Sequence, residues 1–246
     1  MRGSSETFPP GFGPQTYGES FADVYDRWYH DVTDAAGTAR FLAERCVSPS
    51  VLELGVGTGR LVAELVGAGL DVVGVDSSLA MMRGPGAGPL RAVADISALP
   101  FRVGRRFGGA ICAFNTLFNL PTAELQQLVL AETAAVTTGP IVVEALTGAA
   151  LADADVQSLG ISRLTSDSLV LAATVVDHDA QTVTGQHVDI TPAGITLRPW
   201  HLRWTTPPQL DRMAAEVGLE LAERYSDWNG SLYDQFSETH VSVYRH

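Results

Sequence analysis

The sequence predicts an α/β fold in which a mostly parallel sheet carries helices on both faces. Between about residues 50 and 146, short apolar runs bounded by turn residues alternate with helical segments. Strands joined by crossover helices run parallel, so this alternation predicts a parallel sheet. The pattern then changes: between residues 168 and 206, three β-rich runs follow one another without a helix, which predicts a three-stranded antiparallel insert. The five strands predicted before the change are 50–56, 71–76, 90–96, 108–115 and 139–146.

The segments on either side of this core carry their own signals. Before the first strand, residues 19–32 place aromatic side chains at helical spacing, and 36–46 form a second amphipathic segment. After the insert, residues 207–219 begin with prolines and end near a glycine, as a helix does. Two further strands are expected in 220–228 and 240–246. We therefore expect one α/β domain with an insert rather than two independent domains.

Composition and charge narrow the function classes. The 246-residue chain has 46% hydrophobic residues and a net charge of −12, which fits a globular protein and argues against a nucleic-acid partner or an anionic membrane surface. No apolar run reaches the roughly 20 residues that span a bilayer, and the first residues lack the apolar core of a secretion signal. The two cysteines, Cys46 and Cys112, have no metal-ligand spacing, so no metal site and a cytoplasmic location are expected.

The stretch "VLELGVGTGRL" (51–61) is the strongest functional signal. Gly55, Gly57 and Gly59 directly follow an apolar strand and precede a helix, where missing Cβ atoms let a backbone approach a ligand. The spacing differs from the dinucleotide fingerprint G-x-G-x-x-G, because Arg60 stands in place of the last glycine, and no Gly-Lys-Ser/Thr follows to make a phosphate loop. Glu53 would repel a pyrophosphate but suits a positively charged ligand.

This stretch resembles motif I of the class I S-adenosylmethionine (SAM) dependent methyltransferases. The segments "GVDSS", "ADIS" and "AFNTLFNL" follow in the order that the family shows. The resemblance covers roughly residues 17–146, and 207–246 in layout. It implies a Rossmann-like methyltransferase fold with a seven-stranded, mostly parallel sheet and an antiparallel β-insert after the fifth strand. The implied organisation is a flexible arm 1–16 and a single domain 17–246, divided into a helical lid 17–46, a SAM-binding core 47–146, an insert 165–206 and a C-terminal part 207–246.

The resemblance also implies roles for individual residues. The three glycines would shape the pocket for the methionine part of SAM, Glu53 would support the loop or the ligand ammonium, and Asp76 would hold the ribose hydroxyls. Met81, Asp95 and Ile96 would border adenine, and the backbone at Ala113 to Asn115 would receive the amino group. The implied cofactor contacts in these motifs are Glu53, Gly55, Gly57, Gly59, Asp76, Ser77, Met81, Asp95, Ile96, Ala113 and Asn115.

The aromatic segment "FADVYDRWY" resembles the N-terminal helix of small-molecule methyltransferases, including amino-sugar N-methyltransferases. Tyr25 and Tyr29 are four residues apart and share a helix face, so they could cover the SAM site as a lid, with Tyr17 just upstream. A helix that simply packs by its aromatic stripe is the alternative. His30 lies beside this lid and is the candidate general base by position.

The remaining histidines are weaker candidates for a base. His178 falls in a predicted turn, His201 alternates with the apolar side of its strand and would face solvent or the mouth of the site, and His187 and His240 have no distinguishing position. A base is needed only if the acceptor arrives protonated. Methyl transfer otherwise depends on alignment and a dry pocket.

The sequence thus predicts a SAM-dependent methyltransferase that acts on an N or O atom of a small molecule, with a secondary metabolite or sugar-like acceptor implied by the resemblance alone. A non-methylating reaction on the same fold, such as a cyclisation, stays open, because both uses keep the same loop. A nicotinamide-dependent oxidoreductase and a non-catalytic subunit are the more distant alternatives. The insert, with its aromatic and basic strand "LRPWHLRW", is where we expect acceptor recognition or a homodimer contact.

Overall fold

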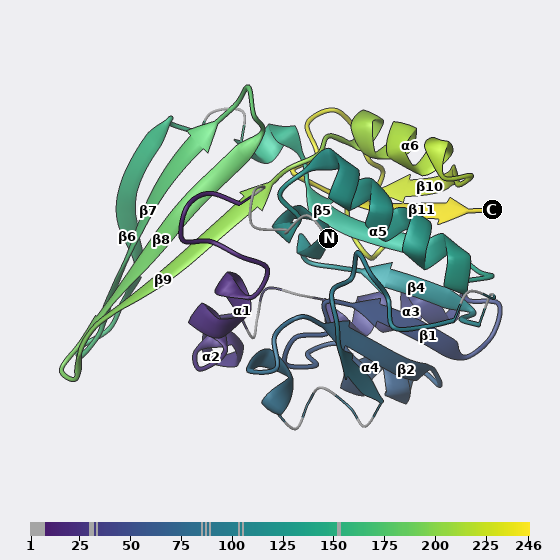
Figure 1. Ribbon diagram of the computed structural model, residues 1–246, viewed down its shortest axis with the longest axis horizontal. Coiled ribbons are helices and arrows are strands. Elements are labelled where there is room, and N and C mark those ends of the chain that lie inside the picture. The colour runs from purple at the N-terminus through teal and green to yellow at the C-terminus, as the bar shows by residue number, and fades with distance from the viewer. Residues whose placement is uncertain are drawn as a thin grey trace.

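The computed structural model describes residues 8–29, 32, 34–84, 86, 88, 90–102, 104, 106–151 and 154–246. Its central element is a seven-stranded sheet in the order β10-β11-β5-β4-β1-β2-β3, in which β11 runs antiparallel to both of its neighbours (Figure 1). The strands are β1 (Ser50–Leu54), β2 (Asp71–Asp76), β3 (Arg91–Val93), β4 (Gly109–Cys112), β5 (Ile141–Leu146), β10 (Glu220–Tyr225) and β11 (Thr239–Arg245). The predicted seven-stranded, mostly parallel sheet is confirmed.

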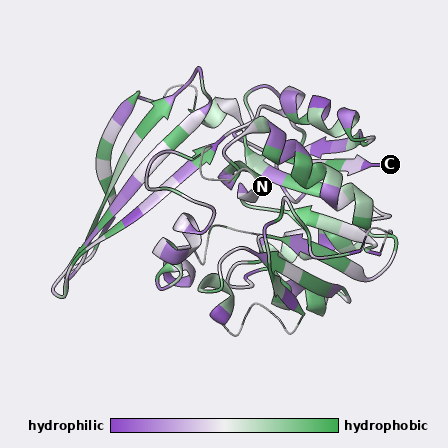
Figure 2. Ribbon diagram, in the orientation of Figure 1, coloured by the Kyte–Doolittle hydropathy of each residue, from purple (hydrophilic) through white to green (hydrophobic). Residues whose placement is uncertain are grey.

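Helices cover both faces of this sheet because successive strand residues point to opposite sides. Leu52 of β1 packs in the cluster that contains side chains of α5 and α6, whereas Val51 packs with α3 and α4 on the other face. The central strands β1, β4 and β5 are mostly buried and apolar, as expected for strands covered on both faces, whereas the edge strand β10 has exposed polar residues and is partly purple in Figure 2. The helices are α3 (Ala35–Ala43), α4 (Val62–Gly67), α5 (Ala123–Val136) and α6 (Pro207–Glu216), with short 3-10 turns η2 (Met81–Arg83), η4 (Thr116–Asn119) and η5 (Gly148–Leu151).

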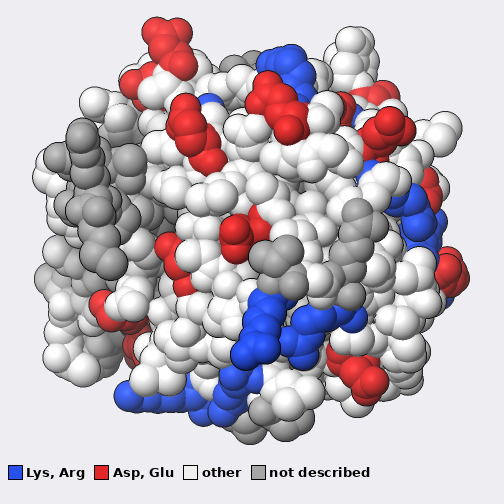
Figure 3. All heavy atoms as spheres, turned by 45° about the vertical axis from the view of Figure 1, so that its right-hand side comes forward, with Lys and Arg blue, Asp and Glu red and all other residues white. Residues whose placement is uncertain are grey.

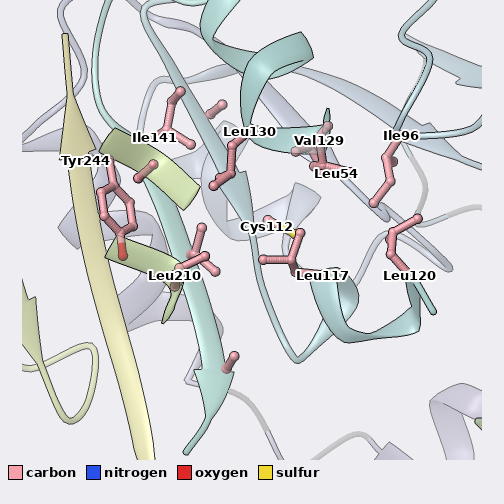
Figure 4. Packing of buried hydrophobic residues seen from close by; sticks show 14 of the residues in the cluster. Leu54, Ile96, Cys112, Leu117, Leu120, Val129, Leu130, Ile141, Leu210 and Tyr244 are labelled. Carbon is pink, nitrogen blue, oxygen red and sulfur yellow. The ribbon is translucent and has the colours of Figure 1, made fainter. Parts of the chain in front are cut away.

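The larger core cluster connects the sheet to the site. Leu54, Cys112 and Leu117 converge between β4 and the turn that follows it, and Leu130, Leu210 and Tyr244 close the other end of the same cluster (Figure 4). Cys112 is 2% exposed, and burial raises the pKa of its thiol to about 12. The carboxyl ends of β1, β2 and β4 are therefore held by dense packing beneath them.

A second sheet of four antiparallel strands stands apart from the first (Figure 1). The three antiparallel strands predicted between residues 168 and 206 are present, but the sequence analysis missed a fourth strand, which lies before the predicted insert boundary at residue 165. That strand is at the edge of the sheet, nearly all its residues are exposed, and its register shifts between Ile161 and Arg163, so it has no buried alternation to reveal it. The strands are β6 (Gln157–Leu164), β7 (Leu169–Asp177), β8 (Thr182–Thr191) and β9 (Gly194–Arg203).

The N-terminal segment also differs from the single helix predicted over residues 19–32. It forms two short helices, α1 (Thr16–Phe21) and α2 (Tyr25–Tyr29), because the chain turns at Ala22–Val24, where the Val24 amide donates to Phe21. Both helices lie between the two sheets in Figure 1. Of the predicted arm, residues 8–16 are described, and Phe8 and Pro14 lie along the cavity reported below.

Acidic side chains are scattered over the face shown in Figure 3, with a group of basic side chains in its lower part. Among the described residues, none of the helices has the length and apolar content needed to cross a bilayer. The same residues contain no cluster of three metal-ligating side chains.

Candidate active site

A cavity of about 360 Å³ opens at the carboxyl edge of the parallel strands, between the sheet, the two N-terminal helices and the second sheet. Most of the residues implied by the resemblance line it, namely Tyr17, Tyr25, Tyr29, Gly55, Gly57, Asp76, Ser77, Met81, Asp95, Ile96 and Asn115. Glu53 and Ala113 line a smaller adjoining cavity, and Gly59 lines neither. His30 lies outside the described residues, so its role as a base stays a prediction.

The glycine loop after β1 has a backbone that other residues adopt only under strain. Gly55, Gly57 and Gly59 have φ angles of 71°, 54° and 86°, all in the left-handed region. A Cβ on Gly55 would collide with the Thr116 side chain, and one on Gly57 would approach the Met81 methyl to 3.3 Å. The loop therefore needs glycine both for its conformation and for the space beside it, and Gly59 serves the turn rather than the cavity wall.

Asp76 at the end of β2 fixes this loop. Its Oδ2 accepts from the Gly57 amide at 2.9 Å, and its Oδ1 accepts from the Ser78 amide at 2.8 Å. Burial raises the pKa of the carboxyl, while the backbone amides that donate to it act in the opposite direction. Each oxygen keeps a further lone pair, so the carboxylate can accept two more donors such as paired ribose hydroxyls.

The third group of predicted residues, Asp95, Ile96 and Met81, forms another part of the cavity wall. Asp95 Oδ1 accepts from both the amide and the hydroxyl of Ser97, at 2.8 and 2.7 Å. Ile96 is buried, and Met81 is 5% exposed with its methyl group close to Gly57. This part of the wall thus combines apolar side chains with one carboxylate, an arrangement suited to an adenine ring and its amino group.

Below the glycine loop lies the smaller cavity, of about 40 Å³. Glu53 is 4% exposed and points its Oε2 into this region without a hydrogen-bond partner among the described residues. The Nε of Arg60 is also buried without a partner there. Burial raises the pKa of Glu53 to about 8, although the positive charge of Arg60 acts against this. The smaller cavity is therefore lined by a residue with a buried acceptor and a residue with a buried donor, each without a partner among the described residues.

The turn after β4 separates the two cavities. Phe114 and Asn115 have φ angles of 52° and 60°, which are rare for residues with a side chain. Glu144 holds this turn, since its Oε2 accepts from the Phe114 amide at 2.9 Å and its Oε1 accepts from Trp228 at 3.0 Å. The Asn115 side chain accepts from the Leu146 amide at 2.7 Å, so it braces the turn while the residue lines the cavity.

The two N-terminal helices form an aromatic wall over the glycine loop. Tyr25 and Tyr29 lie with ring centroids 5.0 Å apart, and Tyr17 meets Tyr25 edge-on at 6.3 Å. Burial raises the pKa values of all three phenols, that of Tyr25 to about 12. Phe21 and Trp28, by contrast, are buried as core. Tyr17, Tyr25 and Tyr29 thus line the cavity, and Tyr25 also packs in the same core cluster as Phe21 and Trp28; the role of the tyrosines as a lid stays a prediction.

The wall opposite the glycine loop comes from β8 and β9. His187, Trp200 and Leu202 line the cavity, and the Trp200 indole donates to His187 Nδ1 at 3.1 Å. Because an indole nitrogen only donates, this bond places the imidazole proton of neutral His187 on Nε2. Burial, together with the charges of Arg163 and Arg198, lowers the pKa of His187. The sequence analysis named His187 only as a weaker candidate base and placed Trp200 in the strand expected to recognise the acceptor; it did not predict the contact between them.

The sequence does contain a feature that could have indicated this pair: a glycine in the strand that neighbours Trp200. Gly185 pairs with Trp200 across the ladder, and a Cβ on Gly185 would collide with the indole ring, so the glycine provides the seat for the tryptophan. His201, the next residue of the strand, points to the opposite face of the sheet from Trp200. It was expected to face solvent or the mouth of the site, but it is buried against Thr184, with a 2.9 Å bond at Nδ1, because residues of the N-terminal arm cover that face.

Comparisons with known proteins identify the family. No protein-family model and no curated protein sequence matches the chain. Among solved structures, the CcbJ methyltransferase from Streptomyces caelestis is 34% identical, with a TM-score of 0.87 over 95% of this chain and 99% of that one. The chain belongs to the SAM-dependent methyltransferases. SAM is accordingly the cofactor, and the unpartnered atoms of Glu53 and Arg60, the glycine loop and Asp76 fit such a ligand.

Two more distant structures show the same fold. A SAM-dependent methyltransferase from Clostridium acetobutylicum is 15% identical, with a TM-score of 0.77 over 92% of this chain and 98% of that one. The amino pentose methyltransferase CalS10 from Micromonospora echinaspora, solved with SAM bound, is 19% identical, with a TM-score of 0.63 over 97% and 100%.

Proposed function

We propose that this methyltransferase transfers the methyl group of SAM to a nitrogen atom of a small molecule. The observation that carries the proposal is the composition of the 360 Å³ cavity. One wall is the glycine loop with Asp76, and the other wall, formed by the tyrosines, His187 and Trp200, is made of side chains that suit an organic acceptor. Cavities of a few hundred Å³ enclose small ligands, which favours a small acceptor over a macromolecule.

The first wall is assigned to the cofactor. Asp76 holds the ribose, Asp95 and Ile96 border adenine with Met81 and Ser77, and the glycine loop takes the methionine part. The backbone at Ala113 to Asn115 receives the amino group of SAM. When bound, SAM supplies an electrophilic methyl group on a sulfonium. The protein aligns the acceptor with it and excludes water, and Tyr17, Tyr25 and Tyr29 of the lid serve that exclusion.

The choice of nitrogen follows from the titratable groups of the second wall. The phenols of Tyr17, Tyr25 and Tyr29 hold their protons more tightly than usual. His187 has its Nδ1 occupied by Trp200, and its other nitrogen carries a proton. No described side chain of this wall is therefore arranged to remove a proton from a hydroxyl group. A neutral amine has a lone pair available and needs no base before it attacks.

The charges near His187 act in the same direction. Burial first, and then the charges of Arg163 and Arg198, lower the pKa of His187, and surroundings that disfavour an imidazolium also disfavour an ammonium group at the same place. An amine acceptor beside His187 would therefore be held in its neutral, nucleophilic form. We further propose a secondary metabolite or sugar-like amine as the acceptor, supported by the resemblance to amino-sugar enzymes and by the amino pentose methyltransferase with the same fold.

Labelled SAM and matched acceptors test this proposal. The protein would be incubated with methyl-labelled SAM and a panel of amino sugars, each beside its hydroxyl counterpart, such as D-glucosamine beside D-glucose. Label is expected on the nitrogen of an amine, located by mass spectrometry. Label on hydroxyl counterparts alone would contradict the nitrogen assignment, and acceptor turnover without a mass gain would favour a cyclisation. The predicted homodimer and cytoplasmic location stay predictions.

A further inference from the structure

The imidazole of His187 is held in one orientation on the wall of the larger cavity. Trp200 lies on the neighbouring strand of the same ladder, and its indole nitrogen donates to His187 Nδ1 at 3.1 Å. The ring centroids of Phe21 and Trp28 lie 5.6 and 5.8 Å from that of the imidazole. A ring that is hydrogen-bonded at one nitrogen and packed against several aromatic side chains has little freedom to turn.

The bond from Trp200 decides which nitrogen of His187 carries the proton. An indole nitrogen only donates, so Nδ1 is the acceptor and the proton of the neutral ring lies on Nε2. Nε2 has no hydrogen-bond partner among the described residues, and it is not one of their buried unpartnered atoms. Because His187 lines the 360 Å³ cavity, this N–H is a fixed donor that a bound molecule can reach.

This donor belongs to the side of the cavity that is assigned to the acceptor. His187 and Trp200 come from β8 and β9, and the rings of Phe21 and Trp28 come from α1 and α2. The residues assigned to the ribose, the adenine and the methionine part of SAM come instead from the glycine loop and from segments that follow β2, β3 and β4. The atom that meets Nε2 is therefore expected on the acceptor.

The reacting nitrogen of the acceptor is not a suitable partner for the Nε2 donor. A neutral amine has one lone pair, and that lone pair must attack the methyl group. A hydrogen bond from Nε2 would occupy it and reduce its reactivity. The partner is therefore a second atom whose lone pairs are not used in the reaction, and the oxygen of a hydroxyl, ether or carbonyl group meets this requirement.

We propose that His187 determines acceptor specificity by donating from Nε2 to an oxygen atom near the reacting nitrogen, while Trp200 holds the imidazole in place. This inference rests on the proposed transfer to nitrogen. The acceptor is then an amine that also carries a hydroxyl, ether or carbonyl oxygen. An amine with only hydrocarbon around its nitrogen leaves the donor unpaired, and a site built around a polar group discriminates against such a ligand.

A purely structural role for His187 is the main competing account, because the imidazole also accepts from the Trp200 indole and packs among aromatic rings. Two variants separate the accounts. His187→Phe keeps a ring but loses both hydrogen bonds, whereas His187→Gln keeps an oxygen for the indole and an N–H for the acceptor. His178→Phe is the matched control, because His178 is exposed in the turn between β7 and β8 and does not line the cavity.

Methyl transfer from SAM to two matched amines is the first test. The amines are trans-2-aminocyclohexanol and cyclohexylamine, which differ by one hydroxyl group. In His187→Phe, the KM of the aminocyclohexanol is expected to rise about 5- to 20-fold with kcat little changed, because the lost hydrogen bond is present before and during the reaction. The KM of cyclohexylamine should change less than about twofold. His187→Gln should retain the preference for the aminocyclohexanol, and His178→Phe should alter neither amine. An equal change for both amines in His187→Phe, or none, would overturn the inference.

NMR of the unmodified protein with nitrogen-labelled histidine is the second test, and it depends neither on turnover nor on the folding of a variant. The imidazole proton of His187 is expected on Nε2, and a proton on Nδ1 would overturn the inference. With S-adenosylhomocysteine bound, the Nε2–H signal should shift on addition of trans-2-aminocyclohexanol and stay in place with cyclohexylamine. The same response to both amines would also overturn it. A selective shift without methylation of any amine would overturn the proposed function alone.

Discussion

The two walls of the cavity are built by different means. The cofactor wall comes from three short motifs at neighbouring strand ends, and it is held by backbone conformation and by bonds such as that from the Gly57 amide to Asp76. The acceptor wall comes from segments far apart in the chain, and side chains hold it together. Arg198, for example, joins β9 to Asp23 of the lid at 2.6 Å and to Asp189 at 3.2 Å. Under the proposed function, recognition of the cofactor therefore depends mainly on backbone conformation, and recognition of the acceptor on side chains.

If this contrast is right, the largest effect comes from changing the backbone of the cofactor wall. Gly55→Ala is expected to lower the free energy of unfolding by about 2–5 kcal/mol, because a left-handed alanine costs about 1–2 kcal/mol and the new Cβ collides with Thr116. Denaturant unfolding measures this change. Gly69→Ala is the matched control, since Gly69 has a φ of 86° and no atom within 4 Å of a built Cβ. Equal destabilisation of the two variants would show that the contact with Thr116 does not matter.

The next effect concerns the carboxylate that holds both the loop and the ribose. Asp76→Ala should weaken S-adenosylhomocysteine binding by about 1–3 kcal/mol, or roughly 5- to 150-fold, because a charge-assisted acceptor is removed. Calorimetry measures the affinity. Asp71→Ala changes an exposed aspartate at the start of the same strand and should leave the affinity unaltered. Unchanged affinity in Asp76→Ala would refute its role in the cofactor wall.

A substitution of Gly185, against which Trp200 packs, should affect the acceptor wall without affecting cofactor binding. Gly185→Ala forces the indole to move and breaks its bond to His187. The value of kcat/KM for a nitrogen acceptor is expected to fall about tenfold, roughly 1.4 kcal/mol, with the affinity for S-adenosylhomocysteine unchanged. Gly160→Ala in the edge strand of the same sheet, where a Cβ meets nothing within 4 Å, is the control. A parallel loss of cofactor affinity in Gly185→Ala would mean that the walls are not separable.

The smallest expected effect is the release of a proton when the ligand binds. The pKa of Glu53 is raised from 4.5 to about 8, so the free protein holds this carboxyl mostly protonated at pH 7. A ligand ammonium stabilises the carboxylate, and binding should therefore release close to one proton, with affinity rising as the pH increases toward 8. Calorimetry at pH 7 in phosphate and in Tris, whose ionisation enthalpies differ, measures the release. Glu53→Gln should abolish the buffer dependence, and its absence in the unmodified protein would contradict the assignment.

The same contrast explains what the sequence could predict. The central sheet, the glycine loop, Asp76 and Asp95 lie in local patterns, because a strand, a tight turn and the following helix are neighbours in the chain. The acceptor wall depends on tertiary packing that joins residues 17–29 to β8 and β9. His187 therefore looked no different from the other histidines, and the four-stranded insert was predicted one strand short because its edge strand is almost wholly exposed.

Arg60 illustrates a different limit. The sequence showed that it departs from the dinucleotide fingerprint, but a departure does not say where a side chain points. Its position depends on the Tyr29 carbonyl and the Phe114 ring, which come from two other elements. Its unused donor becomes visible only once those contacts are known.

The left-handed turn at Phe114 and Asn115 limits how this enzyme can be redesigned. Its φ angles of 52° and 60° are uncommon for residues with a side chain, so most substitutions of Asn115 would add strain to the turn. His187, Trp200 and Leu202 lie on extended strands that accept many side chains, and they border the same cavity. An engineer seeking a new acceptor should randomise those three positions and leave the turn as it is.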